Sequence, residues 1–75
     1  MRDYDLIIRF KSITGAKNTN EIASLLDVKQ SYISKIKSEA NKLSEKTAHK
    51  MYLIAGEEIA QLWGKLQEER VRKKR

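Results

Sequence analysis

The sequence predicts an all-α protein, a compact bundle of about five short helices. Apolar residues recur at intervals of three and four, and the alternation that strands need is absent. The 75 residues also include no Pro, which would interrupt helices. A chain of this length suffices for one small domain with a thin core, because only about 60 to 65% of its unfolded surface can be buried.

The first helix is predicted from about Tyr4 to Thr14. Asp3 or Asp5 can cap its start, because a carboxylate accepts hydrogen bonds from the free N–H groups of a first turn. Gly15 follows the last apolar position, where a left-handed residue commonly ends a helix. The inward stripe at i, i+1, i+4 and i+7 consists of Leu6, Ile7, Phe10 and Ile13.

Two shorter helices follow, separated by a tight turn. Asn18 and Glu21 form an N-x-x-E capping box at the start of the second helix, which ends at Leu26. The third helix is predicted over 29–39, with Asp27 in the turn before it. Helices that cross at a steep angle tolerate little bulk at the crossing point. We expect the two helices to be held together by Ile22, Ala23, Leu26, Val28, Ile33 and Ile36.

The fourth and fifth helices are predicted on either side of Gly56. Ser44 is a suitable N-cap for the fourth helix, and the acidic residues after Gly56 suit the positive end of the fifth helix dipole. The fourth helix is expected to bury Ala48, Met51, Tyr52 and Ala55. The apolar stripe of the fifth helix consists of Ile59, Leu62, Trp63 and Leu66, with Val71 as a weak continuation.

The third predicted helix is mostly polar and positively charged. Its apolar anchors are Ile33 and Ile36. Gln and Ser side chains can donate to and accept from base edges, and Lys binds guanine acceptors or phosphate oxygens. We therefore expect contacts with DNA bases from Gln30, Ser31, Ser34 and Lys35. The alternative is an ordinary solvated helix face, which most surface helices have.

Residues 18–38 resemble the helix-turn-helix of phage repressors of the lambda repressor and Cro class. They are more similar to short phage transcription activators with V-x-x-S-x-I-S-x-x-K after the turn, a pattern carried here by Val28, Ser31, Ile33, Ser34 and Lys37. Ala23 occupies the position of close helix contact, and Asp27 stands where many relatives have Gly. The resemblance implies a lambda-repressor-like fold whose third helix enters the major groove.

The function implied is that of a sequence-specific, double-stranded DNA-binding transcriptional regulator of phage or prophage type. Repressor and activator both stay open, as does a contact with RNA polymerase or another regulator. Helix N-termini receive anions readily, and polar side chains near them bind phosphates. We expect contacts with the DNA backbone from Asn18, Thr19, Lys29, Tyr32 and Lys37. No cofactor is expected.

The net charge of +6 is unevenly distributed along the chain. Residues 1–28 are neutral and residues 29–50 carry +4, whereas residues 51–69 carry −3 and residues 70–75 carry +5. Positive segments attract polyanions, and without a broad apolar face they favour nucleic acid over a membrane surface. We expect a DNA-binding domain over 1–69, followed by a basic tail that is either solvated or follows a phosphate backbone.

The stripe on the fifth helix has two interpretations. It either completes a small core or pairs two chains. We expect a homodimer, with contacts from Ile59, Leu62, Trp63 and Leu66, because the core is thin. A two-fold axis also suits a palindromic operator with half-sites about 34 Å apart. Two other functions stay open: a protein-binding antirepressor or adaptor that uses the Trp63 helix, and a charge-driven RNA-binding or architectural protein.

The sequence lacks the residue sets that catalysis and metal binding need. There is no Cys, and His49 is the only His. The adjacent pairs Glu57–Glu58 and Glu68–Glu69 point about 100° apart on a helix, so an enzyme is not expected. Apolar runs such as Leu6–Ile8 and Tyr52–Ala55 are too short to span a membrane, and no secretory signal is visible. We expect a cytoplasmic protein of a bacterial host.

Overall fold

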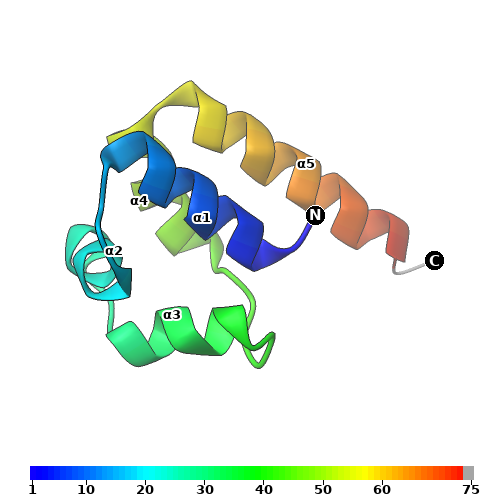
Figure 1. Cartoon of the computed structure of the whole chain (residues 1–75). Helices are drawn as coiled ribbons and strands as arrows, with labels where there is room; N and C mark the ends of the chain where they lie inside the picture. The colour runs from blue at the N-terminus through cyan, green and yellow to red at the C-terminus, as the bar shows by residue number, and fades with distance from the viewer. Residues whose placement is uncertain (74–75) are drawn as a thin grey trace.

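The computed structural model describes residues 1–73, with side chains as far as Val71. These residues form five α-helices and no strand, so the all-helical prediction is confirmed. The helices are α1 (Asp3–Thr14), α2 (Thr19–Leu26), α3 (Gln30–Lys37), α4 (Glu45–Ala55) and α5 (Glu57–Lys73). The end of α5 extends beyond the other helices (Figure 1).

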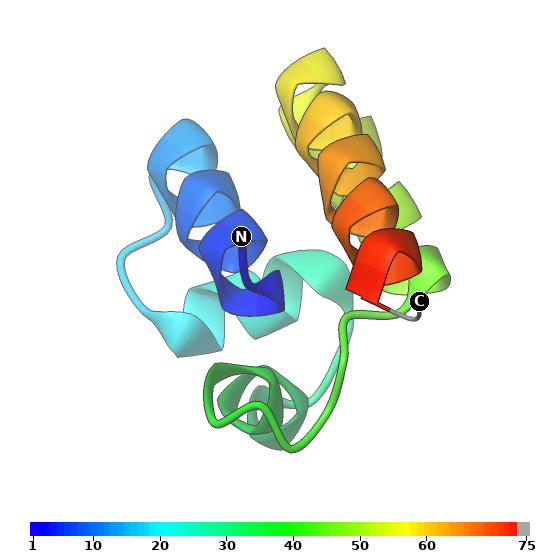
Figure 2. The same cartoon turned by 90° about the vertical axis from the view of Figure 1, so that its right-hand side faces the viewer.

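α3 and α5 lie on opposite sides of the molecule (Figures 1 and 2). α5 folds back along α4 at Gly56, whose φ of +94° suits a residue without a Cβ. α1 packs against both of these helices, and α2 packs against α3 and α4. The main helix contacts of α3 are therefore with α1 and α2, which leaves its other side without a neighbouring helix.

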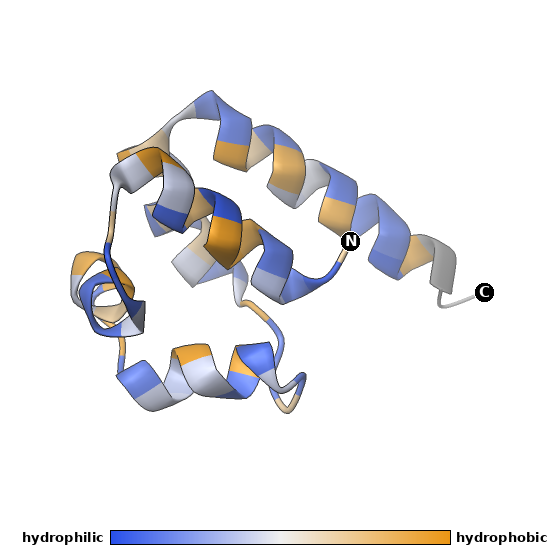
Figure 3. Ribbon diagram, viewed as in Figure 1, coloured by the Kyte–Doolittle hydropathy of each residue, from blue (hydrophilic) through white to orange (hydrophobic). Residues whose placement is uncertain are grey.

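The core is a single cluster of apolar side chains from all five helices and from the segment before α4. Figure 3 shows the apolar residues on the inner sides of the helices. The fully buried members are Leu6, Ile7, Phe10, Ile22, Ala23, Leu26, Ile33, Ile36, Leu43, Ala48, Met51 and Ile59. The prediction that Ile13 belongs to this core is wrong, because Ile13 is 38% exposed. The half-buried Thr14 follows it in the same last turn of α1, and its hydroxyl donates to the carbonyl of Phe10.

Local hydrogen bonds fix both ends of α2. The Asn18 Oδ1 accepts from the N–H of Glu21 at 2.9 Å, as the predicted cap requires. The reciprocal bond is displaced by one residue, because the Glu21 carboxylate accepts from the N–H of Lys17 and not from that of Asn18. At the other end, Asp27 adopts the left-handed conformation with φ +54° and ψ +47°. The N–H of Val28 then bonds to a carbonyl of α2 at 3.0 Å, which completes the turn into α3.

α3 is shorter than the sequence predicts. It is eight residues long and ends at Lys37, so the prediction of a helix over 29–39 is wrong at its C-terminal end. Glu39 is left-handed, with φ +65°, and the next two N–H groups bond back to the carbonyl of Lys35 at 2.9 and 3.2 Å. The chain reverses here, and Leu43, which is only 2% exposed, then packs in the core.

The apolar stripe of α5 packs within its own chain. Ile59 and Leu66 are 0% and 2% exposed, and Leu62 and Trp63 are half-buried. The guanidinium of Arg70 lies 5.3 Å from the centre of the Trp63 ring, within cation–π range. Ile59 and Leu66, which were expected as dimer contacts, are therefore not available to a second chain in this fold.

We predict that Asp27→Val lowers the free energy of unfolding by about 1 to 2 kcal/mol, because a β-branched residue is strained in the left-handed region. Asp27→Gly should change it by less than about 1 kcal/mol. Urea unfolding followed by circular dichroism measures both. The matched control is Lys29→Val at an exposed position with φ −77°. Equal losses for the two valine variants would contradict a role for the left-handed backbone.

A second prediction concerns the ion pair between Arg9 of α1 and Glu58 of α5. The hydrogen bond from Arg9 holds the pKa of the Glu58 carboxyl below its ordinary value, and the Arg9 charge acts in the same direction. Such a carboxyl stabilises the fold at pH above its ordinary pKa, and this contribution is lost as the pH falls through the lowered pKa.

The original chain should therefore lose stability more steeply than Arg9→Met when the pH falls from neutral to about 3. The difference is expected to be small, because both side chains are about half exposed to solvent. Urea unfolding at a series of pH values in low salt measures it. Parallel stability curves for the two chains would show that the pair does not contribute.

Candidate nucleic-acid interface

The outer side of α3 carries the four side chains that the sequence predicts as base contacts. Ile33 and Ile36, on the inner side, are each 1% exposed. The exposed residues on the outer side are Gln30, Ser31, Ser34 and Lys35. Within the described part of the chain, none of these four side chains takes part in a hydrogen bond or an ion pair. Their donors and acceptors are thus available to an external partner.

Positive charge without a carboxylate partner lies on and after α3. The ion pairs found in residues 1–71 join Met1 to Glu69, Arg2 to Glu39, Arg9 to Glu58 and Arg70 to Asp3. None of these pairs uses a lysine of the segment with net charge +4, which contains Lys29, Lys35, Lys37, Lys42, Lys46 and Lys50. Charges that are not neutralised locally attract polyanions over about one Debye length, roughly 8 to 10 Å.

The lysines at the two ends of α3 are held differently. Lys29 is the N-cap residue of the helix and is exposed. The ammonium group of Lys37 lies 5.9 Å from the centre of the Tyr4 ring in α1, within cation–π range. The Lys29 side chain can therefore adjust its position to an external anion, whereas the Lys37 side chain also contacts α1.

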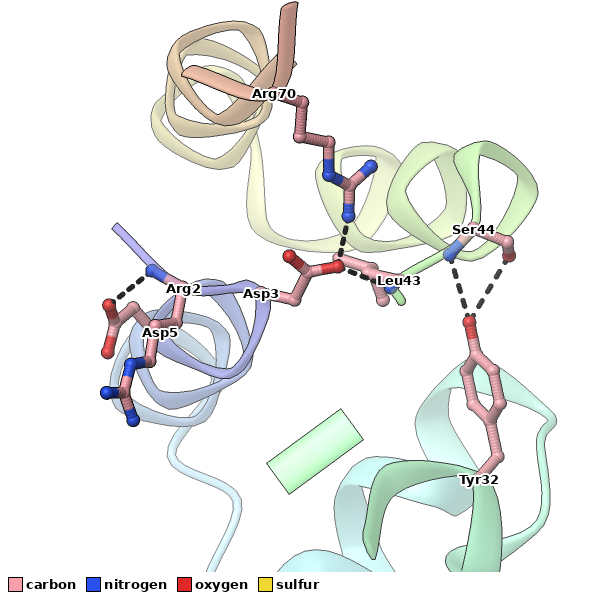
Figure 4. Close-up of polar contacts among 7 residues, drawn as sticks. All are labelled: Arg2, Asp3, Asp5, Tyr32, Leu43, Ser44 and Arg70. Atoms are coloured by element: carbon pink, nitrogen blue, oxygen red, sulfur yellow. Dashed lines mark hydrogen bonds and ion pairs between the residues drawn. The ribbon is translucent and has the colours of Figure 1, made fainter. Parts of the chain in front are cut away.

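Tyr32, predicted as a contact with the DNA backbone, uses its hydroxyl within the protein. The Tyr32 oxygen accepts from the N–H of Ser44 at 3.0 Å and lies 3.3 Å from the Ser44 Oγ (Figure 4). Ser44 is the N-cap of α4, as predicted, and its Oγ accepts from the N–H of Thr47 at 3.2 Å. Tyr32 thus connects the first turn of α3 to the start of α4.

Asp3 of α1 holds Leu43, the residue before Ser44. Its Oδ2 accepts from the N–H of Leu43 at 2.6 Å and pairs with the guanidinium of Arg70 (Figure 4). Asp3 or Asp5 was predicted to cap α1, but this is wrong: the N-cap residue is Arg2, whose N–H donates to the Asp5 carboxylate, and the Asp3 carboxylate contacts Leu43 and Arg70 instead. No sequence pattern indicates the Asp3 contacts, because they join residues 40 and 67 positions apart.

The start of α2 is less open to a phosphate than the sequence suggests. The Asn18 side chain serves as the helix cap, and Thr19 is half-buried. The carboxylate of Glu21 lies against the N–H of Lys17, which places a negative charge at this helix end. This negative charge opposes the binding of a phosphate at the start of α2.

The predicted boundary between domain and tail falls inside α5. The helix continues to Lys73, and Arg70 is joined to Asp3 of α1. Arg70 is therefore a structural residue in this fold and not part of a free tail. Residues 74 and 75, which were expected to belong to the tail, lie outside the described residues.

The described residues show neither a metal-binding cluster nor a helix suited to a membrane. In the described residues, no three side chains of His, Cys, Asp or Glu come together where they could hold a metal ion. His49 instead lies edge-on to the ring of Tyr52, with 4.7 Å between ring centres. None of the helices described has the length and apolar character that crossing a bilayer requires.

Comparison of the chain with protein-family models, curated proteins and solved structures gives no match. The chain's own residues carry three features of a candidate interface: the exposed polar face of α3, lysines without carboxylate partners and the contacts that hold α3 in place.

Proposed function

We propose that α2 and α3 form a helix-turn-helix and that the protein is a sequence-specific, double-stranded DNA-binding transcriptional regulator of the phage type. α3 would lie in the major groove of an operator. The observation that carries the proposal is the outer face of α3, where four exposed side chains able to bind base edges have no partner in the described chain.

The junction between the two helices supports the motif. The side chain of Ala23 is 3% exposed, and its carbonyl accepts from the N–H of Val28 at 3.0 Å, so the chain turns tightly after α2. Asp27 supplies the left-handed residue that this turn requires. A helix with its side chains is about 10 to 12 Å across and fits a major groove about 12 Å wide.

The chemistry of the outer face suits base recognition. A Gln amide binds the N6 and N7 of adenine with two hydrogen bonds, and a Lys ammonium donates to the O6 or N7 of guanine. Ser hydroxyls accept and donate, so they adapt to several bases. Gln30 at the first turn and Lys35 further along therefore provide two different base preferences on one helix.

The distribution of charge favours the approach of DNA to one side of the protein. The segment of residues 29–50, with net charge +4, includes α3, whereas the segment of residues 51–69, with net charge −3, lies in α4 and α5. α3 and α5 are on opposite sides of the body (Figure 1). A polyanion is therefore attracted to the α3 side and repelled by the acidic part of α5.

Selection of bound duplexes from a random pool, followed by sequencing, tests the proposal. Enrichment of a defined motif is expected. An inverted repeat with half-site centres one helical turn apart would indicate a two-fold dimer, and a single site would indicate a monomer. Absence of any motif together with preference for single strands or structured RNA would overturn the proposal in favour of a charge-driven RNA-binding protein.

We predict that Gln30→Ala weakens binding to the selected duplex by about 1 to 3 kcal/mol and relaxes the preference at one base pair. Binding to random duplex should hardly change, because nonspecific binding depends on phosphates. Fluorescence anisotropy with both duplexes measures the two affinities. Gln61→Ala, at an exposed glutamine of α5, is the matched control and should match the original chain. Unchanged discrimination in Gln30→Ala would refute the proposed orientation of α3.

We also predict that Lys29→Ala weakens binding to all duplexes alike. Loss of one phosphate contact should reduce the slope of log K against log salt concentration by about 0.9. Titrations at several salt concentrations measure this slope. Lys65→Ala removes an equal charge from an exposed site on α5 and serves as the control. If both variants change the slope equally, Lys29 acts only through the net charge of the protein.

A further inference from the structure

We propose that Tyr32 and Asp3 are positioning residues that set the orientation of α3 by holding two consecutive backbone N–H groups, those of Leu43 and Ser44. This inference rests on the proposed DNA-binding function and assigns to Tyr32 a role other than a phosphate contact. These two N–H groups and their acceptors form a double clamp. It lies where α1, α3, α4 and α5 come together (Figure 4).

On the side of α3, the double clamp depends on one hydroxyl. The Tyr32 oxygen accepts from the N–H of Ser44 at 3.0 Å and lies within donor range of the Ser44 Oγ at 3.3 Å. The same Oγ is 2.9 Å from the hydroxyl of Thr47, which is only 6% exposed within α4. The hydroxyl of Tyr32 is thus joined to a buried part of α4 through Ser44.

On the side of α1, the double clamp depends on a carboxylate. The Asp3 Oδ2 accepts from the N–H of Leu43 at 2.6 Å. The ion pair with Arg70 holds this carboxylate in place, and the two side chains are only 18% and 20% exposed. Because Leu43 itself is buried, the segment of residues 43–44 is fixed to α1 and α5 and presents Ser44 to Tyr32 at a defined position.

These contacts matter because the apolar anchorage of α3 is narrow. Only Ile33 and Ile36 of the helix are fully buried, and a helix held along one stripe resists rolling about its axis poorly. Hydrogen bonds to base edges weaken steeply when a donor moves by a fraction of an ångström, whereas the attraction of a lysine to phosphate falls only slowly with distance. A loss of orientation should therefore reduce specific binding and spare nonspecific binding.

The first experiment uses Tyr32→Phe, which removes only the hydroxyl. We expect the affinity for the selected duplex to fall measurably, by at most about twelvefold, which corresponds to the free energy of one neutral hydrogen bond, while the affinity for random duplex and the salt slope stay the same. A parallel fall on random duplex with a reduced salt slope would identify Tyr32 as a phosphate contact. Unchanged binding to both duplexes would also overturn the proposal.

Matched variants separate positioning from general destabilisation. Tyr4→Phe removes a hydroxyl that makes no hydrogen bond within the described residues and keeps the ring under Lys37, so it should behave as the original chain. Asp3→Asn removes the charge that pairs with Arg70 but keeps an oxygen that can accept from the N–H of Leu43, so it should retain more of the discrimination than Asp3→Ala. Equal effects of the two Asp3 substitutions, measured well below their melting temperatures, would contradict a role for the accepting oxygen.

A second experiment tests the double clamp without DNA. In the free protein, Tyr32→Phe should increase the hydrogen-exchange rate of the Ser44 N–H and change the residual dipolar couplings of the α3 amides relative to those of α4. Tyr4→Phe should change neither. Unaltered couplings in Tyr32→Phe would overturn the inference. If the original chain selects no duplex, the proposed function fails, whereas these couplings still decide whether the double clamp orients α3.

Discussion

The structure depends on the burial of Ile33 and Ile36, the two fully buried side chains of α3, next to which the half-buried Tyr32 also packs against the core. Two isoleucines remove only a narrow strip of apolar surface from water, so the hydrophobic effect holds α3 close without fixing its rotation. The rotation must come from contacts at its edges. The structure provides Tyr32 toward α4 at one edge and Lys37 over the Tyr4 ring of α1 at the other. Apolar burial thus sets the position of α3, and polar contacts set its angle.

Most of the features that the sequence predicts correctly depend on local chemistry, and several of those that it misses depend on distant residues. The caps at Asn18 and Ser44 and the helix ends at Gly15 and Gly56 were predicted, because each involves hydrogen bonds or backbone angles within about one turn. The end of α3 at Lys37 was not predicted: Glu39 is left-handed there, and the chain reverses before Leu43 enters the core. For the candidate site, the exposure of the outer face followed from helical periodicity, whereas no spacing rule links Asp3 to residues 40 and 67 positions away.

The apolar stripe of α5 was predicted correctly, but the surface that it packs against could not be predicted from local spacing. Periodicity identified the apolar side of the helix, but it does not say whether that side meets the same chain or another one. In the fold, Ile59 and Leu66 are buried between α5 and the helices beneath it. Arg70, expected in a free basic tail, pairs with Asp3 and lies over Trp63. One end of α5 is therefore fastened to the same junction that holds the segment after α3.

The contacts around α3 help to distinguish a surface that recognises DNA bases from an ordinary solvated helix face. Both have polar, exposed side chains, so exposure alone does not distinguish them. A solvated face functions equally well at any small rotation of its helix, because water adapts to it. A surface that binds base edges does not, because hydrogen bonds need donors and acceptors within a few tenths of an ångström and near-linear geometry. An eight-residue helix is held at its edges by Tyr32 and Lys37, and the partner of Tyr32 is fixed in turn through Asp3. This restraint is what the proposed recognition of bases would need, whereas solvation alone does not need it.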